Sequence, residues 1–314
     1  MSTLEPNRIV QSADGAPFLS PKDLADAIGV SESSLKRWVD DGRLVAVRTA
    51  GGHRRIPLHE AVRFVRAQRF TLAHPEILGL PANEARAITP GAQEPFLQQL
   101  LAENAFGARA YLVQRYLSGV GFAALCDGPI HTALEHVGQL WKHDEKGIAV
   151  EHRATDIAIQ SLSYLRSLLP PAPEDAWTAV GYAPSGDPYL LPSLACAAVL
   201  AEAGWRDKNL GPDTPLAAVR EVIQTSRPKL VWCALSLEQP GEIAAREAVE
   251  LANELAQTGT YLVLGGRGAA ALDLVGRDNV LIVGSMVELA AFARGLAAAR
   301  IAAPKPVASV EPAS

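Results

Sequence analysis

Hydroxyl and cationic side chains gather near the amino terminus at helical spacing. The group comprises Ser33, Ser34, Lys36 and Arg37. Leu35 and Trp38 alternate with them at positions that would face inward on the same helix. Such hydroxyls and cations bind phosphate oxygens and base edges. The group therefore predicts a surface that contacts duplex DNA.

A second group of donors surrounds a pair of glycines. Gly51-Gly52 predicts a tight turn after Leu44–Arg48, where alternating residues are typical of a short strand. The donors of this hairpin are Arg48, His53, Arg54 and Arg55. A glycine hairpin with cations beside a recognition helix is a wing, and its donors are placed to bind the DNA backbone.

Two short helices must position these groups. Ser20 and Pro21 predict the start of the first helix, with Asp23 completing a capping box, and Gly29 predicts its end. Ser31 predicts the cap of the second. Two short helices joined by a glycine-containing turn are the helix-turn-helix signature, whose second helix enters the major groove. A solvated helical hairpin in a protein–protein module is the alternative.

The order of helix, turn, helix, GGHRR wing and third helix in residues 17–72 resembles the winged helix-turn-helix of MerR-type transcription regulators. This resemblance implies double-stranded operator DNA as the partner.

The charge of the chain is divided unevenly. Among 314 residues the net charge is −5, yet residues 1–72 contain 11 Lys and Arg against 8 Asp and Glu. Only this segment is basic, so only it suits nucleic acid, with an affinity that depends on salt. The cysteines Cys126, Cys196 and Cys233 stand among apolar neighbours, which predicts reduced core residues. No signal or membrane-spanning segment is evident, and a cytoplasmic location away from membranes is expected.

The length and the changing hydrophobic period predict a multidomain α and α/β protein. It would comprise a winged helix-turn-helix, a four-helix bundle and a Rossmann-like doubly wound parallel sheet. The expected boundaries are a disordered arm at 1–16, the DNA-binding domain at 17–72, a linker at 73–94, the bundle at 95–171, the Rossmann-like domain at 175–302 and a disordered tail at 303–314.

Short apolar runs in the last third predict buried parallel strands at Trp177–Tyr182, Leu230–Leu235, Tyr261–Leu264 and Val280–Val283. Helices are expected between and after them at Leu191–Ala203, Pro215–Thr225, Gly241–Thr258 and Ser285–Ala299. The segment RDKNLG, where a further strand is expected, is unusually polar for one.

A helical bundle followed by a Rossmann-like domain resembles the cobalamin-binding module of corrinoid proteins. Joined to a MerR-type head, it resembles the CarH-like, light-responsive, adenosylcobalamin-dependent repressors. Trp141 and the pair Glu151-His152 match the family residues that cover the adenosyl group. Their chemistry suits that role, because an indole can cover a nucleoside while a carboxylate and an imidazole bind its polar edges.

The resemblance extends to the carboxyl ends of the strands. Ser236 matches the serine of the pocket for the cofactor's nucleotide tail, and Gly265-Gly266 match a diglycine that lets that tail approach the backbone. Asp187 matches the family's acid in the first loop. The chain departs from the family at Tyr189, which stands where the cobalt-binding histidine is found, and a neutral phenol is a poor cobalt ligand beside an imidazole.

Three interpretations follow from this departure. Adenosylcobalamin binds without a protein ligand below cobalt, or the pocket holds another tetrapyrrole, since tyrosine can ligate haem iron, or the module binds nothing and assembles the repressor as a scaffold. The resemblance implies a repressor, not an enzyme, that acts as a homodimer or tetramer and serves as a photoreceptor. No further metal site is expected.

Overall fold

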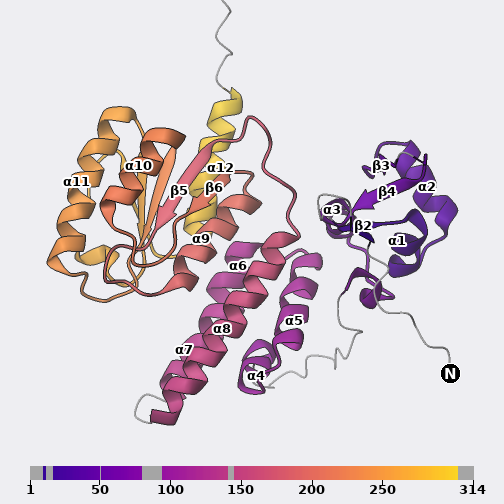
Figure 1. Cartoon of the computed structure of the whole chain (residues 1–314), viewed down its shortest axis with the longest axis horizontal. Helices are drawn as coiled ribbons and strands as arrows, with labels where there is room; N and C mark the ends of the chain where they lie inside the picture. The colour runs from indigo at the N-terminus through magenta and orange to yellow at the C-terminus, as the bar shows by residue number, and fades with distance from the viewer. Residues whose placement is uncertain (1–9, 12–16, 50, 80–93, 141–144, 303–314) are drawn as a thin grey trace, which may run out of the picture.

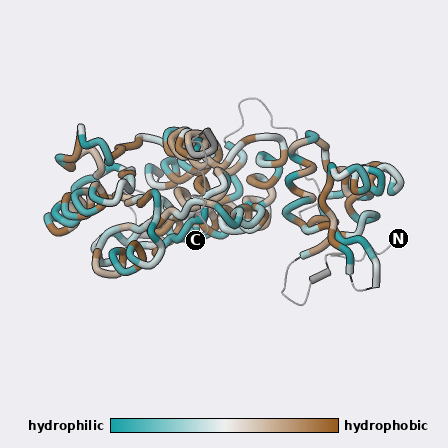
Figure 2. The backbone as a smooth tube through the Cα atoms, turned by 90° about the horizontal axis from the view of Figure 1, so that it is seen from above, coloured by the Kyte–Doolittle hydropathy of each residue, from teal (hydrophilic) through white to brown (hydrophobic). Residues whose placement is uncertain are grey.

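The computed structural model describes residues 10–11, 17–49, 51–79, 94–140 and 145–302 (Figure 1). They form a winged helix-turn-helix head, a helical bundle and an α/β domain in chain order, with the bundle between the other two. Hydrophobic stretches run through the interior of the bundle and the α/β domain, whereas hydrophilic turns recur on the helices at the outside (Figure 2). The multidomain α and α/β class is thus confirmed.

The head combines three helices with a small antiparallel sheet. Its elements are β2 (Pro17–Leu19), α1 (Pro21–Ile28), α2 (Glu32–Asp40), β3 (Val47–Arg48), β4 (Arg54–Pro57) and α3 (Leu58–Gln68). The capping box is present, because Ser20 Oγ accepts from the Asp23 amide at 3.1 Å and the Asp23 carboxylate accepts from the Ser20 amide at 3.1 Å. Gly29 ends α1 at φ +70°, a conformation that glycine adopts without steric cost.

Two short elements extend the head beyond its expected bounds. Strand β1 (Val10–Gln11), inside the segment expected to be disordered, pairs with β2. The 3-10 helix η1 (Pro75–Leu78) lies inside the expected linker, yet the amide of Ala73 donates to the Ala27 carbonyl at 2.8 Å and Leu78 is buried. The head therefore continues to Gly79, because its own backbone and core hold this segment. The rest of the expected arm and the tail lie outside the described residues.

In the described part of the chain, four helices form the bundle, as expected. They are α4 (Pro95–Leu101), α5 (Ala105–Leu117), the run α6 (Phe122–Leu125), η2 (Cys126–Ile130) and α7 (His131–Leu140), and α8 (Glu145–Ser167). The run passes through the π-helical turn η2 at Pro129, a residue that lacks the amide donor of a regular helix. Helix α8 begins at Glu145, so Glu151 and His152 lie inside it.

The α/β domain has a five-stranded parallel sheet in the order β6-β5-β7-β8-β9. The strands are β5 (Thr178–Tyr182), β6 (Arg206–Asn209), β7 (Leu230–Ala234), β8 (Tyr261–Gly265) and β9 (Val280–Val283). The helices are α9 (Leu190–Glu202), α10 (Leu216–Ser226), α11 (Glu242–Thr258) and α12 (Met286–Ala302), with a 3-10 turn η3 (Ala269–Ala271). The polar RDKNLG segment supplies β6, whose position at the sheet edge explains its composition.

The two faces of this sheet have separate cores. Residues of α9 and α12 cover one face together with the bundle, and residues of α10 and α11 cover the other. Cys126 and Cys233 are buried and Cys196 is half-buried, and burial raises the pKa of the Cys233 thiol to about 12. The prediction of reduced core cysteines is consistent with this placement. None of the described helices combines the length and the apolar character that crossing a bilayer requires.

Candidate nucleic-acid interface and ligand site

The recognition helix presents part of its expected group to solvent. Ser31 caps α2 and its hydroxyl also lies 2.9 Å from those of Ser33 and Ser34, so these two hydroxyls already share a network at the helix start. Lys36 forms an ion pair with Glu32 at 2.8 Å. Arg37 is exposed and, among the described residues, has no acidic partner. Arg37 is therefore the cation of this helix best placed to bind a phosphate.

The wing is tied to the recognition helix by an ion pair. Its strands β3 and β4 pair Val47 with Arg55 and Arg48 with Arg54. Arg54 Nη2 lies 2.5 Å from the Asp40 carboxylate of α2, so the charge expected to bind backbone is engaged within the head. Arg48 and His53 are exposed, and Arg55 is half-buried. Sequence reasoning missed Asp40, because nothing local marks an acid at the end of α2 as a partner of the wing.

The candidate ligand site lies at the carboxyl edge of the α/β sheet. The strand order reverses between β5 and β7, the place where doubly wound sheets bind ligands. A cavity of about 240 Å³ is present here, lined by the loops after β5 and β7. It is smaller than the roughly 300–1,000 Å³ of ordinary small-molecule pockets. As it stands, the cavity suits part of a ligand rather than a whole macrocycle.

Asp187 is a structural clamp at this edge. It is 2% exposed, and its two carboxylate oxygens accept from the amides of Tyr189 at 3.2 Å and Ser236 at 2.6 Å. It thereby fastens the loop after β5 to the end of β7. Tyr189 precedes α9 as its N-cap residue with its side chain 43% exposed. The acid and the tyrosine that replaces histidine are thus neighbours, but the carboxylate holds backbone and not the phenol.

Ser236 and the two glycines lie close together, as expected. The hydroxyl of Ser236 is buried and has no hydrogen-bond partner among the described residues. Gly266 has φ +100°, and a Cβ there would lie 2.3 Å from the carbonyl oxygen of Leu235. A Cβ on Gly265 would meet Val283 Cγ2 at 3.3 Å. The room that the diglycine leaves is therefore taken largely by the chain's own strand ends, because the loop after β7 packs on it.

Trp232 was not singled out by sequence reasoning and fills the sheet face beneath α9. It is 1% exposed, and its Nε1 donates to Ser193 Oγ of α9 at 3.2 Å. In the adjacent strand the register sets Gly181 opposite it, and a Cβ on Gly181 would lie 1.6 Å from the indole. A flat ring could enter beneath α9 only by displacing this indole. The pairing of this tryptophan with a glycine could have indicated its role, but the pairing is known only once the strand register is known.

Only two of the three residues expected to cover an adenosyl group lie within the described part of the chain. Glu151 and His152 are exposed on α8, and Trp141 lies outside the described residues. No group of three or more His, Cys, Asp or Glu side chains in the described part of the chain is placed to hold a metal ion. At the carboxyl edge the Ser236 hydroxyl is left without a partner among the described residues, and Tyr189 offers a phenol where an imidazole would be needed for cobalt.

Comparison with known proteins identifies the head and finds a relative that is similar over most of the chain. Residues 18–69 match a family model described as a helix-turn-helix domain. The HTH-type transcriptional repressor CarA of Myxococcus xanthus is 29% identical over 273 residues, which cover 79% of this chain and 86% of CarA.

Three solved structures show a weak likeness to the chain. They are the methanol:cobalamin methyltransferase complex MtaBC of Methanosarcina barkeri (18% identity, TM-score 0.33, 67% of this chain and 79% of that one), the monomethylamine corrinoid protein of the same organism (15%, 0.49, 64% and 96%), and a cobalamin-binding protein of Desulfitobacterium hafniense (15%, 0.30, 67% and 97%). The sheet order and helix placement given above define the fold independently of them. With its helix-turn-helix head and its similarity to CarA over most of its length, the chain is a DNA-binding transcriptional regulator whose domain order resembles that of the CarH-like repressors.

Proposed function

We propose that the chain is a repressor whose bundle and α/β domain sense a cobalamin-type cofactor and thereby control oligomerisation and operator binding, including in response to light. A regulator accounts for the head, which an enzymatic corrinoid carrier would not need. The proposed DNA contacts are Ser33, Ser34, Lys36, Arg37, Arg48, His53, Arg54 and Arg55. Of these, Lys36 and Arg54 would have to exchange their ion pairs with Glu32 and Asp40 for phosphate. The proposed cofactor contacts are Trp141, Glu151, His152, Asp187, Tyr189, Ser236, Gly265 and Gly266.

One observation carries the sensor part of this proposal, the unpaired hydroxyl of Ser236 at the point where the strand order reverses. A buried hydroxyl without a partner costs about 1–3 kcal/mol, so a polar ligand atom that meets it gains that amount on binding. Glu151 and His152 are exposed on α8, and in this proposal they would offer a carboxylate and an imidazole to the same ligand from the bundle. When bound, adenosylcobalamin would supply a cobalt–carbon bond that light can cleave.

The protein's own groups limit how such a cofactor is held. Asp187 is committed to two backbone amides, and Tyr189 offers a phenol in place of an imidazole. The chain would therefore bind the cofactor through its periphery, with the benzimidazole of the cofactor or water below cobalt. Ligation by Tyr189 would favour haem iron instead.

Titration of the full chain with adenosylcobalamin tests this function. We expect binding with a base-on or base-off absorption spectrum rather than a histidine-ligated one. Tyr189→His should tighten binding by about tenfold or more and shift the spectrum, because imidazole is the better cobalt ligand. Tyr189→Phe, which removes only the hydroxyl, should leave both unchanged. Gel filtration in the dark and after illumination reports the oligomeric state.

A second function, a ligand-free scaffold, is favoured by the filled core. Trp232 occupies the space beneath α9, and the loop after β7 occupies the space beside Gly266. A wild-type chain that purifies colourless and ignores both added cobalamins and haemin would establish the scaffold and end the sensor proposal. Haemin binding with a tyrosinate spectrum, lost in Tyr189→Phe, would identify the other tetrapyrrole.

Trp141 provides a separate test of the cap. If its indole covers the adenosyl group, Trp141→Ala should lower the affinity for adenosylcobalamin while leaving that for hydroxocobalamin, which lacks the group, unchanged. If Trp141 is instead a core residue, the substitution should cost about 3–5 kcal/mol of folding stability with or without ligand. Thermal melts and titrations with both cobalamins separate the two outcomes.

A further inference from the structure

Arg66, on the third helix of the head, places its guanidinium against backbone carbonyls and an aromatic ring of the bundle. Its Nη1 donates to the carbonyls of Tyr116 at 2.8 Å and Val120 at 2.9 Å, and its Nη2 to that of Gly119 at 3.4 Å. Its Cζ lies 3.8 Å from the centre of the Tyr116 ring. These carbonyls lie at and just beyond the carboxyl end of α5, where the helix dipole favours a cation. The geometry uses the planar fork that distinguishes arginine from lysine.

The same guanidinium reaches the α/β domain. Arg66 Nη2 lies 3.4 Å from Glu202 Oε1, and the side chains of the pair are 24% and 20% exposed. The other oxygen of Glu202 accepts from the Phe122 amide at 2.8 Å. That amide belongs to the first residue of α6, whose N-cap residue is Gly121 and has no side chain to cap it. Head, bundle and α/β domain therefore meet at one cluster of charged and backbone groups, the Arg66 node.

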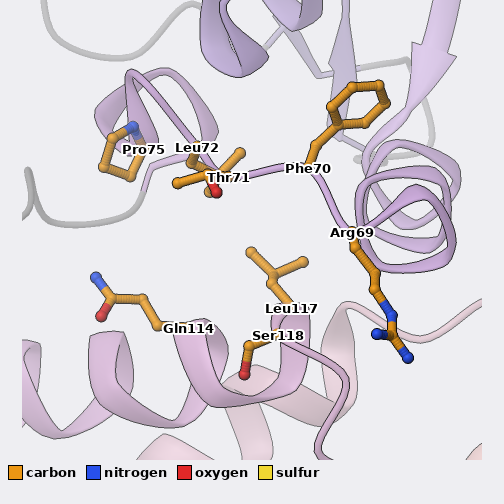
Figure 3. Close-up of a pocket in the computed structure, with 8 residues that line it drawn as sticks. All are labelled: Arg69, Phe70, Thr71, Leu72, Pro75, Gln114, Leu117 and Ser118. Atoms are coloured by element: carbon orange, nitrogen blue, oxygen red, sulfur yellow. The ribbon is translucent and has the colours of Figure 1, made fainter.

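A cavity interrupts the packing between the head and the bundle. Beside the node is a cavity of about 340 Å³ (Figure 3). Arg69, Phe70, Thr71, Leu72 and Pro75 line it from the head, and Gln114, Leu117 and Ser118 line it from α5. The cavity removes part of the dispersion attraction between the two surfaces, which depends on close approach of atoms. Buried apolar residues of the head and of the bundle still belong to one continuous hydrophobic cluster, and the node adds the directed polar contacts to this docking.

Helix α9 connects the node to the candidate ligand site. Its amino end follows Asp187 and Tyr189 at the carboxyl edge of the sheet, and its last residue is Glu202. Thirteen residues of helix span about 20 Å. The bundle packs along α9, and Asp127 of η2 accepts from the amides of Met286 and Val287 at 2.9 Å each, which fixes it to α12 as well. If α9 shifts as a rigid helix at the carboxyl edge of the sheet, Glu202 at its other end moves relative to the bundle and α12.

We propose that Arg66 is the positioning residue that docks the DNA-binding head onto the bundle, and that Glu202, at the far end of α9, makes this docking depend on the state of the carboxyl edge of the α/β sheet. The docking itself needs no ligand. The dependence on the carboxyl edge rests on the sensor function proposed above. The recognition helix α2 lies on the side of the head that faces away from the bundle and remains free in the docked state (Figure 1).

Full-length variants test both parts. Arg66→Ala should release the head and raise the radius of gyration and maximum dimension in small-angle X-ray scattering. Arg66→Lys, which keeps the charge but not the fork, should give an intermediate value. Glu202→Gln should keep the head docked, since the three carbonyls remain. Arg63→Ala is the matched control, because Arg63 lies on the same helix and pairs only with Glu60 among the described residues.

The effect of adenosylcobalamin on DNA affinity distinguishes the proposed coupling from a purely structural role of Arg66 and Glu202. Affinity for a short duplex of mixed sequence, measured without ligand, should stay within twofold of wild type in Arg66→Ala and Glu202→Gln. Any change in that affinity caused by adenosylcobalamin should be lost in both variants and kept in Arg63→Ala. Scattering from Arg66→Ala identical to wild type, with a native circular dichroism spectrum, would overturn the docking. A wild type that does not bind the cobalamin would instead defeat the sensor proposal, and the scattering result would stand. A cobalamin effect preserved in Glu202→Gln would overturn the role of α9.

Discussion

Replacing Arg37 and Arg48 together by alanine is expected to lower the affinity of the full chain for duplex DNA by about 100-fold at low salt. Both side chains are exposed, and neither has an acidic partner in the described part of the chain. Each is free to form a charge-assisted hydrogen bond to a phosphate, worth about 1.5–3 kcal/mol, or roughly tenfold or more in affinity. Arg37 lies on the recognition helix and Arg48 on the wing, so the pair samples both parts of the interface.

The salt dependence distinguishes phosphate contacts from other losses. Removing two phosphate ligands should reduce the slope of log affinity against log salt by about two, measured by fluorescence anisotropy between about 50 and 200 mM salt. Arg63→Ala, a cation on α3 paired with Glu60, should change neither affinity nor slope. A double variant that loses affinity with an unchanged slope would show that these arginines do not bind backbone.

Replacing Arg54 by alanine should affect DNA binding by a different route from replacing Arg37 or Arg48. Its partner Asp40 anchors the wing to the recognition helix, so Arg54→Ala removes a cation and also leaves an exposed acid facing the DNA side. Sequence alone placed Arg54 among the phosphate ligands, because local spacing shows which side chains share a hairpin but not which acids from another helix reach them. The prediction of a wing was correct, whereas the availability of each cation depended on packing between elements.

Local signals account for the parts of the fold that the sequence predicted closely. The capping box at Ser20 and Asp23 and the left-handed Gly29 fix α1 within a few residues, and apolar runs fix β5, β7, β8 and β9. The element η1 was missed because a proline-rich segment with little periodicity is held by hydrogen bonds to Ala27, far away in sequence. The end of the head depends on these long-range contacts, so it cannot be predicted from the residue pattern of one segment.

In the candidate ligand site too, local sequence indicated some features, whereas long-range contacts determined others. The sequence singled out Asp187, Ser236 and the diglycine, and the structure places them near one another at the carboxyl edge. What they bond to was not predictable, since Asp187 clamps two amides and the diglycine receives the loop after β7. Trp232, which decides how much room the domain has, lies in an unremarkable apolar strand. Its role follows only from the parallel register with Gly181.

A double-mutant cycle between Gly181 and Trp232 is expected to show large and non-additive losses of stability. Trp232→Ala should cost about 3–5 kcal/mol, because it empties a fully buried site and removes the bond to Ser193. Gly181→Ala should cost at least the roughly 1–3 kcal/mol of an overpacked core, since its Cβ would lie 1.6 Å from the indole. The backbone of Gly181 does not have the positive φ that would itself penalise alanine.

The double variant should be more stable than the sum of the two losses by about 1–3 kcal/mol, because the new methyl group fills part of the space that the indole leaves. Chemical denaturation followed by circular dichroism measures each corner of the cycle. Trp232→Phe serves as the control, since it keeps a ring against Gly181 and loses only the donor to Ser193. Free indole should raise the melting temperature of Trp232→Ala by occupying its cavity, and should do so less in the double variant. Additive losses, or indole that stabilises neither variant, would mean that the core collapses when Trp232 is removed. In that case the volume beneath α9 would exist only while the Trp232 indole fills it, and a ligand's ring could not enter there.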